Sequence, residues 1–213
     1  MRRLICTLMI AIVTLPSRAT EDVRITQTRS AAIADVAAAT DAVTLHLYFF
    51  RGSQWQPDDV ASLLPAVSSL LAQCGIAIAH ARIHTVDAPR RFRMYATPVA
   101  RELLRTLAVS RPAVFFVDET LNRPAYDAET IGLANSRSRP ELAHTIWVAY
   151  GARDLPYALA HELVHLLSNS GEHSDEPGNL MRDETAPENA VLTSRQCETA
   201  RERGEAQGLL ARR

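Results

Sequence analysis

Three histidines, the first followed directly by a glutamate, lie within the stretch HELVHLLSNSGEHSDEPGNLM, which runs from His161 to Met181. His161 and His165 are four residues apart, so on a helix both imidazoles lie on one face, one turn from each other. Two imidazoles in that position can bind one metal ion, and His173 can supply a third nitrogen after the chain turns back at Gly171. A catalytic zinc ion takes three protein ligands and keeps a fourth position open. The spacing therefore predicts a zinc site at His161, His165 and His173.

Glu162 follows the first histidine and lies about 100° further round the helix. From there its carboxylate can reach a water molecule activated by the metal ion without itself binding the ion. It can take a proton from that water and later pass it to a leaving amine, as a general base and acid does. HExxH is a short pattern that occurs by chance, but here it falls on a capped amphipathic helix that follows a strand.

Two other side chains compete with His173 for the third ligand position. Asp175 has a carboxylate two residues further on, and carboxylates also bind zinc. Glu184 lies beyond Met181, at a distance at which thermolysin-like enzymes place a glutamate, although the rest of their motif is absent. The sequence favours His173 and leaves Asp175 and Glu184 open as alternatives.

The remaining histidines are interpreted as structural because each falls on an expected strand. Two of them share the HxxxH interval, but four residues of a strand span roughly 13 Å, so they cannot form the same clamp. These four residues are His46, His80, His84 and His144.

Apolar and β-branched runs predict the strands that must surround the histidine-bearing helix. One of these runs, PAVFFVDE, is almost wholly apolar, which is typical of a strand buried on both faces. The polar, alanine-rich residues 20–41 are expected to form, in part, a loose N-terminal segment. The expected strands are at residues 43–50, 76–86, 112–119, 131–136 and 144–151.

Four helices are expected between and after these strands. Asp58 or Asp59 can cap the first, and the histidine-bearing helix has Asp154 as its N-cap, Pro156 in its first turn and Gly171 as a left-handed exit. This order predicts a single α/β (α+β) domain with a mixed twisted sheet, a long active-site helix and a C-terminal helix. The expected helices are at residues 58–73, 98–107, 154–168 and 191–210, the last with Thr193 or Ser194 near its start.

The first residues have the layout of a secretory signal peptide. Two arginines precede an apolar run of a dozen residues, and Ser17-Arg18-Ala19 offers a small-x-small exit. We expect cleavage after Ala19, which gives a leader at 1–19 and one domain at 20–213. An uncleaved anchor is disfavoured because the apolar run is short for a membrane span. The chain is therefore expected to be secreted or periplasmic, with no stable membrane insertion after cleavage.

All 23 basic residues are arginine, and three of them lie in the leader. The 194 residues after Ala19 then carry 20 arginines against 24 acidic residues, a net charge of −4. That balance gives no reason to expect a nucleic acid or an anionic membrane as a partner. The length suits one domain with a sizeable core.

Removal of the leader takes away Cys6 and leaves Cys74 and Cys197. Two cysteines in an exported chain can form a disulfide, which here would tie an early helix to the last one. Two buried thiols are the alternative. A zinc role is disfavoured because neither cysteine belongs to a CxxC-type pair.

The run HELVHLL…GEHSDEPGNLM resembles the active-site segment of the metzincin zinc peptidases, and most closely the matrixin type. The family consensus is HExxHxxGxxH, followed by a tight turn with a methionine below the metal. The stretch IGLANS at 131–136 resembles the edge strand on which such enzymes bind their substrate as an added strand. The resemblance implies three zinc ligands, a general base and a Met-turn methionine at His161, His165, His173, Glu162 and Met181.

The chain departs from the family pattern in three places. Its third histidine follows the second by eight residues, where the family has six, and Ser168 stands at the family's glycine. An insertion of two residues within Ser168-Asn169-Ser170 accounts for both. No tyrosine follows Met181, so the tyrosine that assists at the metal in some members has no counterpart. Arg182 or Tyr157 could assist instead, and nothing in the sequence selects one.

These observations predict a zinc-dependent endopeptidase with one catalytic Zn²⁺ ion and a peptide or protein substrate. By the resemblance, residues 182–192 would wall the S1′ pocket, but this polar loop indicates no substrate preference. A catalytically silent, zinc-stabilised binding module is one alternative, and a zinc amidase acting on cell-wall peptides is another. Glu162 argues against the silent module, because a structural zinc site has four protein ligands and no use for a base.

Overall fold

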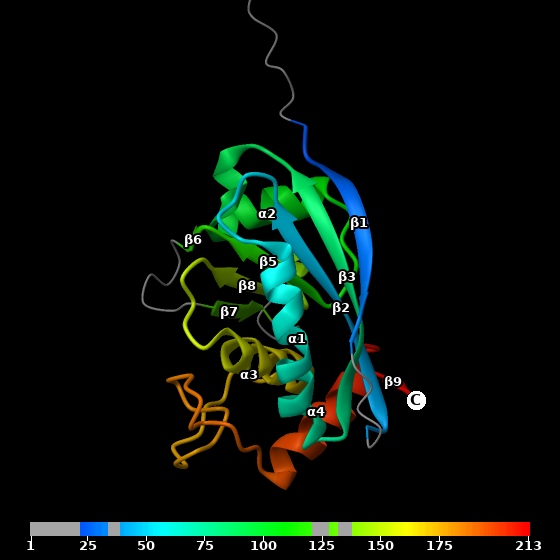
Figure 1. Ribbon diagram of the computed structural model, residues 1–213, viewed down its shortest axis with the longest axis vertical. Helices are drawn as coiled ribbons and strands as arrows, with labels where there is room; N and C mark the ends of the chain where they lie inside the picture. The colour runs from blue at the N-terminus through cyan, green and yellow to red at the C-terminus, as the bar shows by residue number, and fades with distance from the viewer. Residues whose placement is uncertain (1–21, 34–38, 121–127, 132–137) are drawn as a thin grey trace, which may run out of the picture.

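A twisted mixed β-sheet forms the centre of the molecule (Figure 1). The computed structural model describes residues 22–33, 39–120, 128–131 and 138–213. The strand order is β1-β3-β2-β5-β8-β7, and β9 pairs with the start of β2. The bounds are β1 (Arg24–Ala32), β2 (Asp41–Phe50), β3 (Ile76–Asp87), β5 (Ala113–Val117), β7 (Ala128–Ile131), β8 (Thr145–Ala149) and β9 (Ala211–Arg212).

The four inner strands of this sheet run parallel, whereas β1 and β7 at its two edges run antiparallel to their neighbours. All five residues of β5 are buried, as expected for an inner strand covered on both faces. A second, two-stranded sheet pairs β4 (Met94–Tyr95) with β6 (Glu119–Thr120). The expectation of one α/β domain with a mixed sheet is confirmed.

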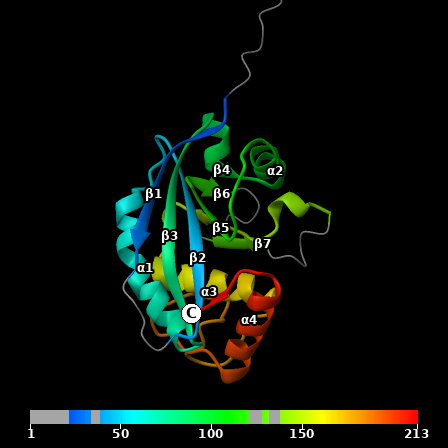
Figure 2. The same ribbon diagram turned by 90° about the vertical axis from the view of Figure 1, so that its right-hand side faces the viewer.

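Four α-helices within the described residues cover the sheet from both sides. Helix α1 lies on one side of β1, β3 and β2 and α2 on the other, while α3 and α4 lie together at the far end (Figure 2). Short 3-10 turns at η1 (Arg90–Arg93) and η3 (Pro140–Leu142) flank α2. The helices are α1 (Pro57–Ala72), α2 (Thr97–Thr106), α3 (Leu155–Ser168) and α4 (Ser194–Ala206).

Alternation along β2 divides the core between the two faces of the sheet. Leu45 and Leu47 point into the larger core, which α1, α3 and α4 close. Tyr48 and Phe50 point into a smaller aromatic core beneath α2. Successive side chains of a strand face opposite sides, so one strand supplies both cores. The larger core holds the helix that carries HExxH, which fixes that helix against the parallel strands.

Strand β1 was not predicted from the sequence, in which residues 20–41 were expected to be partly a loose segment. Its sequence RITQTRSAA is mostly polar because most of its side chains are exposed at the edge of the sheet. The strand is held by an antiparallel ladder with β3 that runs from Arg24 opposite Asp87 to Ala32 opposite His80. Backbone pairing of this kind leaves only a weak apolar pattern in the sequence.

The predicted cap of α1 is wrong. The N-cap is Gln56, and Pro57 occupies the first helical position, where its missing N–H costs nothing. Asp58 and Asp59 therefore lie inside the first turn, where their negative charges suit the positive end of the helix dipole.

The last predicted helix, 191–210, is shorter in the structure. Thr193 caps α4 through a capping box in which Thr193 and Gln196 each accept a hydrogen bond from the other's backbone N–H. The helix ends at Ala206, and Gly208 adopts a φ of 68°, which turns the chain into β9. Among the described residues, no helix has both the length and the apolar run needed to cross a membrane.

Candidate metal centre

Helix α3 presents two of the three histidines from a buried position. Asp154 lies at its N-cap with a left-handed φ of 50° and makes no side-chain capping bond. The left-handed exit is supplied by Asn169, with a φ of 47°, and not by Gly171 as the sequence suggested. Asparagine tolerates this conformation better than other residues with a side chain. The chain therefore turns back two residues earlier than predicted, directly after Ser168.

The three histidines converge on one point. Nε2 of His165 lies 2.9 Å from Nε2 of His161 and 3.2 Å from Nε2 of His173. One nitrogen of each ring lies within 4.8 Å of the others, and no second group of three histidine, cysteine or acidic ligands is found in the described part of the chain. The rings of His161 and His173 both stand nearly perpendicular to that of His165.

The opposite nitrogens of the rings are held by acceptors. Nδ1 of His161 donates to the carbonyl oxygen of Leu180, and Nδ1 of His165 donates to that of Ser170, both at 2.7 Å. A carbonyl oxygen can only accept, so both Nδ1 atoms carry the hydrogen and both Nε2 atoms of the neutral rings have free lone pairs. A hydrogen bond from the ring nitrogen that does not bind the metal fixes the orientation of a metal-binding imidazole.

Burial keeps these two imidazoles uncharged. It lowers the pKa of His161, against the opposing effects of the Leu180 hydrogen bond and the charge of Asp183. Burial, followed by the charge of His161, lowers the pKa of His165 to about 3. Both rings are therefore neutral at physiological pH and offer lone pairs to a cation.

The spacing of the three nitrogens fits a zinc ion. Two nitrogens bound to one tetrahedral zinc ion at about 2.05 Å are roughly 3.3 Å apart. The measured distances of 2.9 and 3.2 Å approach that value. Without a cation or a proton between them, three inward-facing lone pairs would repel one another, so the arrangement suits a bound cation.

The turn that contains Met181 lies directly against this site. Its carbonyl at Leu180 accepts the hydrogen bond from His161, and Met181 itself is only 3% exposed, within the larger core. The backbone N–H of Met181 donates to Oδ1 of Asn179, which closes the turn. The structure thus places the predicted methionine beside the histidines, as part of the packing that supports them.

The segment after this turn is anchored by the end of α1. The side chain of Gln73 donates to the carbonyl oxygen of Ala190 at 3.0 Å and accepts from the N–H of Leu192 at 2.7 Å. Between them, Val191 pairs with the chain before Met181 and leaves its side chain 61% exposed. The polar loop at 182–192 is therefore fixed at its far end, next to the metal site.

The predicted alternatives for the third ligand lie apart from the cluster. Asp175 and Glu184 are exposed and belong to no group of candidate metal ligands. Glu162 lies in the same turn of α3 as His161 and is half-buried. Of the two suggested assisting residues, Arg182 donates to the carbonyl oxygen of Asp175, whereas Tyr157 packs against the larger core.

The contact of Asp183 with the third histidine was not predicted from the sequence. The carboxylate oxygen of Asp183 lies 2.8 Å from Nδ1 of His173. Nothing in the local sequence signals this contact, because Asp183 follows His173 by ten residues and approaches it only after the turn at Met181.

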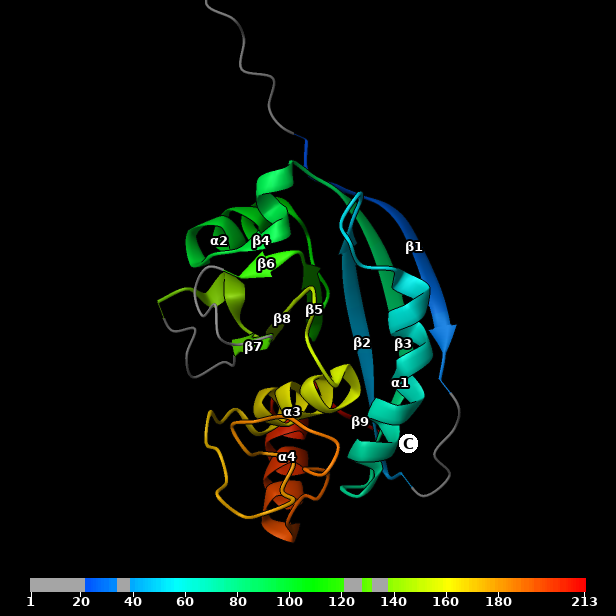
Figure 3. The same cartoon turned by 60° about the vertical axis from the view of Figure 1, so that its left-hand side comes forward.

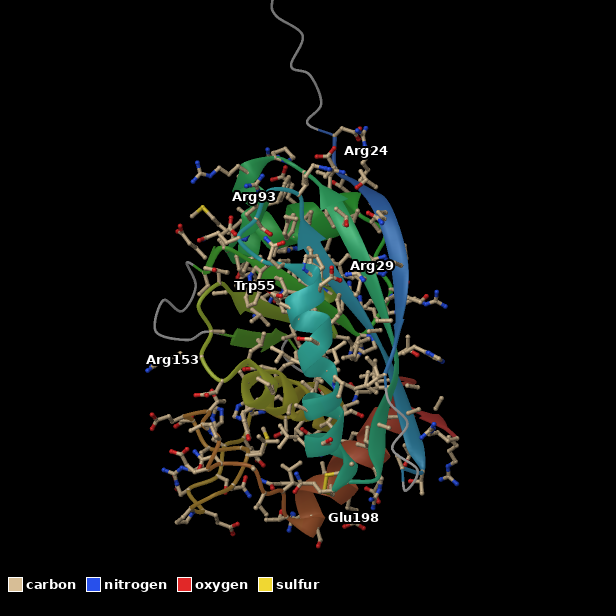
Figure 4. The ribbon with its side chains drawn as sticks, viewed as in Figure 1. Arg24, Arg29, Trp55, Arg93, Arg153 and Glu198 are labelled. Carbon is tan, nitrogen blue, oxygen red and sulfur yellow. A yellow bond between two sulfur atoms is a disulfide. The ribbon has the colours of Figure 1, made fainter. Side chains whose placement is uncertain are left out.

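A disulfide joins the end of α1 to α4, between Cys74 and Cys197, and is seen above Glu198 in Figure 4. Each cysteine follows a glutamine that bonds to the segment around Met181: Gln73 accepts from Leu192, and Gln196 donates to Asn179. The disulfide and the two glutamines together hold this segment.

Strand β7 lies beside α3 at the edge of the sheet, where it pairs only with β8 among the described strands (Figure 3). Of the predicted strand at 131–136, only Ile131 lies within the described residues, as the last residue of β7.

No model of a known protein family matches the chain, and no curated protein matches it. Among solved structures, the fold is similar to that of metalloproteinase-II from Bacteroides fragilis, with a TM-score of 0.55 and 19% sequence identity. The likeness covers 81% of this chain and 56% of that one, so the chain spans little more than half of that protein's length. At this identity the comparison shows a metalloproteinase-like fold.

Proposed function

We propose that this chain is a zinc-dependent endopeptidase of the metzincin type that hydrolyses peptide bonds in peptides or proteins. The observation that carries the proposal is the convergence of three Nε2 atoms, from His161, His165 and His173, two of them on the helix that also carries Glu162. A metalloproteinase-like fold around that site supports it.

Each side chain has a definite task in such a reaction. When bound, the zinc ion supplies Lewis acidity, which polarises the scissile carbonyl and makes a water molecule more acidic. Glu162 accepts the proton of that water as it attacks the carbonyl carbon, and then donates the proton to the nitrogen of the departing amine. The three imidazoles are fixed in orientation, because their Nδ1–H groups are held by acceptors.

The edge strand β7 supports an endopeptidase rather than an exopeptidase. Its outer edge pairs with no other described strand, and it lies beside α3. An extended peptide can add to such an edge through backbone hydrogen bonds, which bind a chain in its middle and require neither terminus.

Export of the protein is part of the proposal. The leader expected at 1–19 supports it, and so does the disulfide between Cys74 and Cys197, since such bonds persist in oxidising compartments.

The test is replacement of Glu162 by glutamine, with Glu172→Gln as the matched control. Glu172 is an exposed glutamate in the loop before His173 and lies outside the histidine cluster. Glu162→Gln should keep one zinc ion per chain. Its rate of hydrolysis of unfolded protein substrates should fall roughly 10²–10⁴-fold, since that is what general-base catalysis contributes. Glu172→Gln should match the wild type in both measurements.

Three other results would redirect the assignment. Equal hydrolysis by the wild type and Glu162→Gln would remove the proposed role of this residue. Zinc binding without hydrolysis of any peptide or protein would favour a silent, zinc-stabilised module. Hydrolysis of cross-linked cell-wall peptides alone would favour an amidase.

A further inference from the structure

The third histidine is held differently from the other two. His161 and His165 are 3% and 7% exposed and project from α3, whereas the side chain of His173 is 34% exposed and comes from a loop. Core packing therefore fixes the first two imidazoles and leaves the third without that support. The connection to His173 is also two residues longer than in the family that the sequence resembles.

The loop that carries His173 packs against Met181 and the residues that follow it. The N–H of Ser174 donates to the carbonyl oxygen of Met181 at 2.8 Å. Arg182 reaches back and donates from Nη1 to the carbonyl oxygen of Asp175 at 2.9 Å. These two contacts hold the loop segments side by side, and Asp183, the residue after Arg182, lies against His173.

Where these segments meet, the carboxylate of Asp183 contacts the imidazole of His173. Oδ1 lies 2.8 Å from Nδ1, while Nε2 of the same ring faces His165 at 3.2 Å. A carboxylate can only accept, so Nδ1 carries the hydrogen and Nε2 presents its lone pair to the centre of the cluster. Asp183 thus does for His173 what the backbone carbonyls of Leu180 and Ser170 do for the two buried histidines.

We propose that Asp183 is a positioning residue for the third metal ligand, and that the segment after Met181 thereby compensates for the longer connection to His173. The inference rests on the proposed zinc-dependent function. A carboxylate behind a metal-binding imidazole fixes the ring and raises its basicity, and loss of such partners typically weakens metal binding 10- to 100-fold. The side chain of Asp183 is 77% exposed, so solvent screens its charge and the effect belongs near the lower figure.

The experiment compares Asp183→Ala and Asp183→Asn with Asp175→Asn in the full-length chain. Asp175 is the matched control, because it is an exposed aspartate on the same loop, two residues from His173 and outside the histidine cluster. Zinc affinity is measured by competition with a chromogenic chelator. The geometry at the ligands is followed by the visible absorption of the cobalt-substituted protein, which does not depend on catalysis.

Asp183→Ala should weaken zinc binding about 10-fold and change the cobalt spectrum, because the His173 ring loses its acceptor. Asp183→Asn can still accept through its amide oxygen, so it should weaken binding less than the alanine variant does. Asp175→Asn should match the wild type in both measurements. If Asp183→Ala does not fold, judged by circular dichroism, the spectrum and affinity of Asp183→Asn decide the question.

Wild-type affinity and an unchanged cobalt spectrum in the Asp183 variants would overturn this inference. Failure of the proposed function gives a different pattern, in which the wild type binds no zinc, or His173→Ala binds it as tightly as the wild type. The two failures are therefore distinguishable.

Discussion

The side-chain amides of Asn179 and Gln196 face each other and exchange two hydrogen bonds of 3.1 Å. Oδ1 of Asn179 also accepts from the N–H of Met181, and Oε1 of Gln196 also accepts from the N–H of Thr193. One pair of side chains thus joins the turn beside the metal site to the first turn of α4. Asn179 is only 3% exposed, so each of these groups would be costly to leave unpaired.

We expect Asn179→Ala to lower the free energy of unfolding by about 2 kcal/mol, because the N–H of Met181 and the side-chain amide of Gln196 lose their hydrogen-bond partner. Urea denaturation of the metal-free protein measures this. Asn189→Ala is the matched control, since Asn189 is also buried but its side chain donates one hydrogen bond, to the carbonyl oxygen of Glu184. Its cost should be smaller, about 1 kcal/mol.

The coupling between the two amides is measured by adding Gln196→Ala and the double variant. The double variant should lose about 1 kcal/mol less than the sum of the single losses, because each single change already removes the shared pair. Strict additivity would show that the pair does not stabilise the turn.

Metal content should identify the ligands. Alanine at His161, His165 or His173 removes one of three imidazoles, and each variant should hold far less than one zinc ion per chain after dialysis. Asp175→Ala and Glu184→Ala should retain the wild-type content, since neither residue belongs to the cluster. Atomic absorption measures the content. If His173→Ala keeps one zinc ion per chain and Asp175→Ala or Glu184→Ala loses it, that carboxylate is the third ligand.

The disulfide should contribute strongly to stability. Cys74 and Cys197 are 123 residues apart and both are buried. The chain-entropy treatment gives about 5 kcal/mol for a loop of this size, and measured losses are about 2–5 kcal/mol. We expect the double variant Cys74→Ala/Cys197→Ala to lose that amount in urea denaturation.

Reductant provides the internal control for this prediction. It should destabilise the wild type toward the level of the double variant and leave the double variant unchanged. Equal midpoints for wild type and double variant in the absence of reductant would contradict the prediction.

The sequence was most informative where a repeated pattern records burial. The inner strands and α3 bury apolar side chains at regular intervals, so their positions followed from period and composition. The spacing of His161 and His165 likewise identified one face of a helix. Strand β1 was missed because an edge strand held by backbone pairing needs few apolar residues.

Contacts that depend on the path of a loop could not be predicted. Asn169, rather than Gly171, provides the left-handed exit of α3, because asparagine also tolerates that conformation and the sequence offers both residues. The approach of Asp183 to His173 depends on how two loop segments align, and no periodicity encodes that alignment. The same holds for the clamp that Gln73 forms on residues 190–192.

We expect two histidines outside the metal site to make stability depend on pH. Nδ1 of His46 lies 3.1 Å from Nε2 of His84, and Nδ1 of His84 lies 2.9 Å from the hydroxyl of Thr28. The ring of Tyr48 stacks on His84 from β2. Burial, then the charges of His46 and Arg82, lower the pKa of His84 to about 4.

A histidine with a lowered pKa is protonated first in the unfolded chain. As the pH falls from about 6.5 to about 4, His84 binds a proton in the unfolded state but stays neutral in the folded state. The contribution of neutral His84 is therefore complete above pH 6.5 and is lost through that window. The difference between a pKa of 6.5 and one of about 4 corresponds to about 3.5 kcal/mol at most.

His84→Gln removes this titration while keeping a side chain that can bond to Thr28, so its unfolding free energy should fall less steeply between pH 6.5 and 4 than that of the wild type. Urea denaturation of the chelator-treated proteins at several pH values measures the slopes. His80→Gln is the matched control, because His80 is an exposed histidine on the same strand β3. It should keep the wild-type slope. Parallel curves for His84→Gln and the wild type would show that the histidine pair does not set the acid sensitivity of the fold.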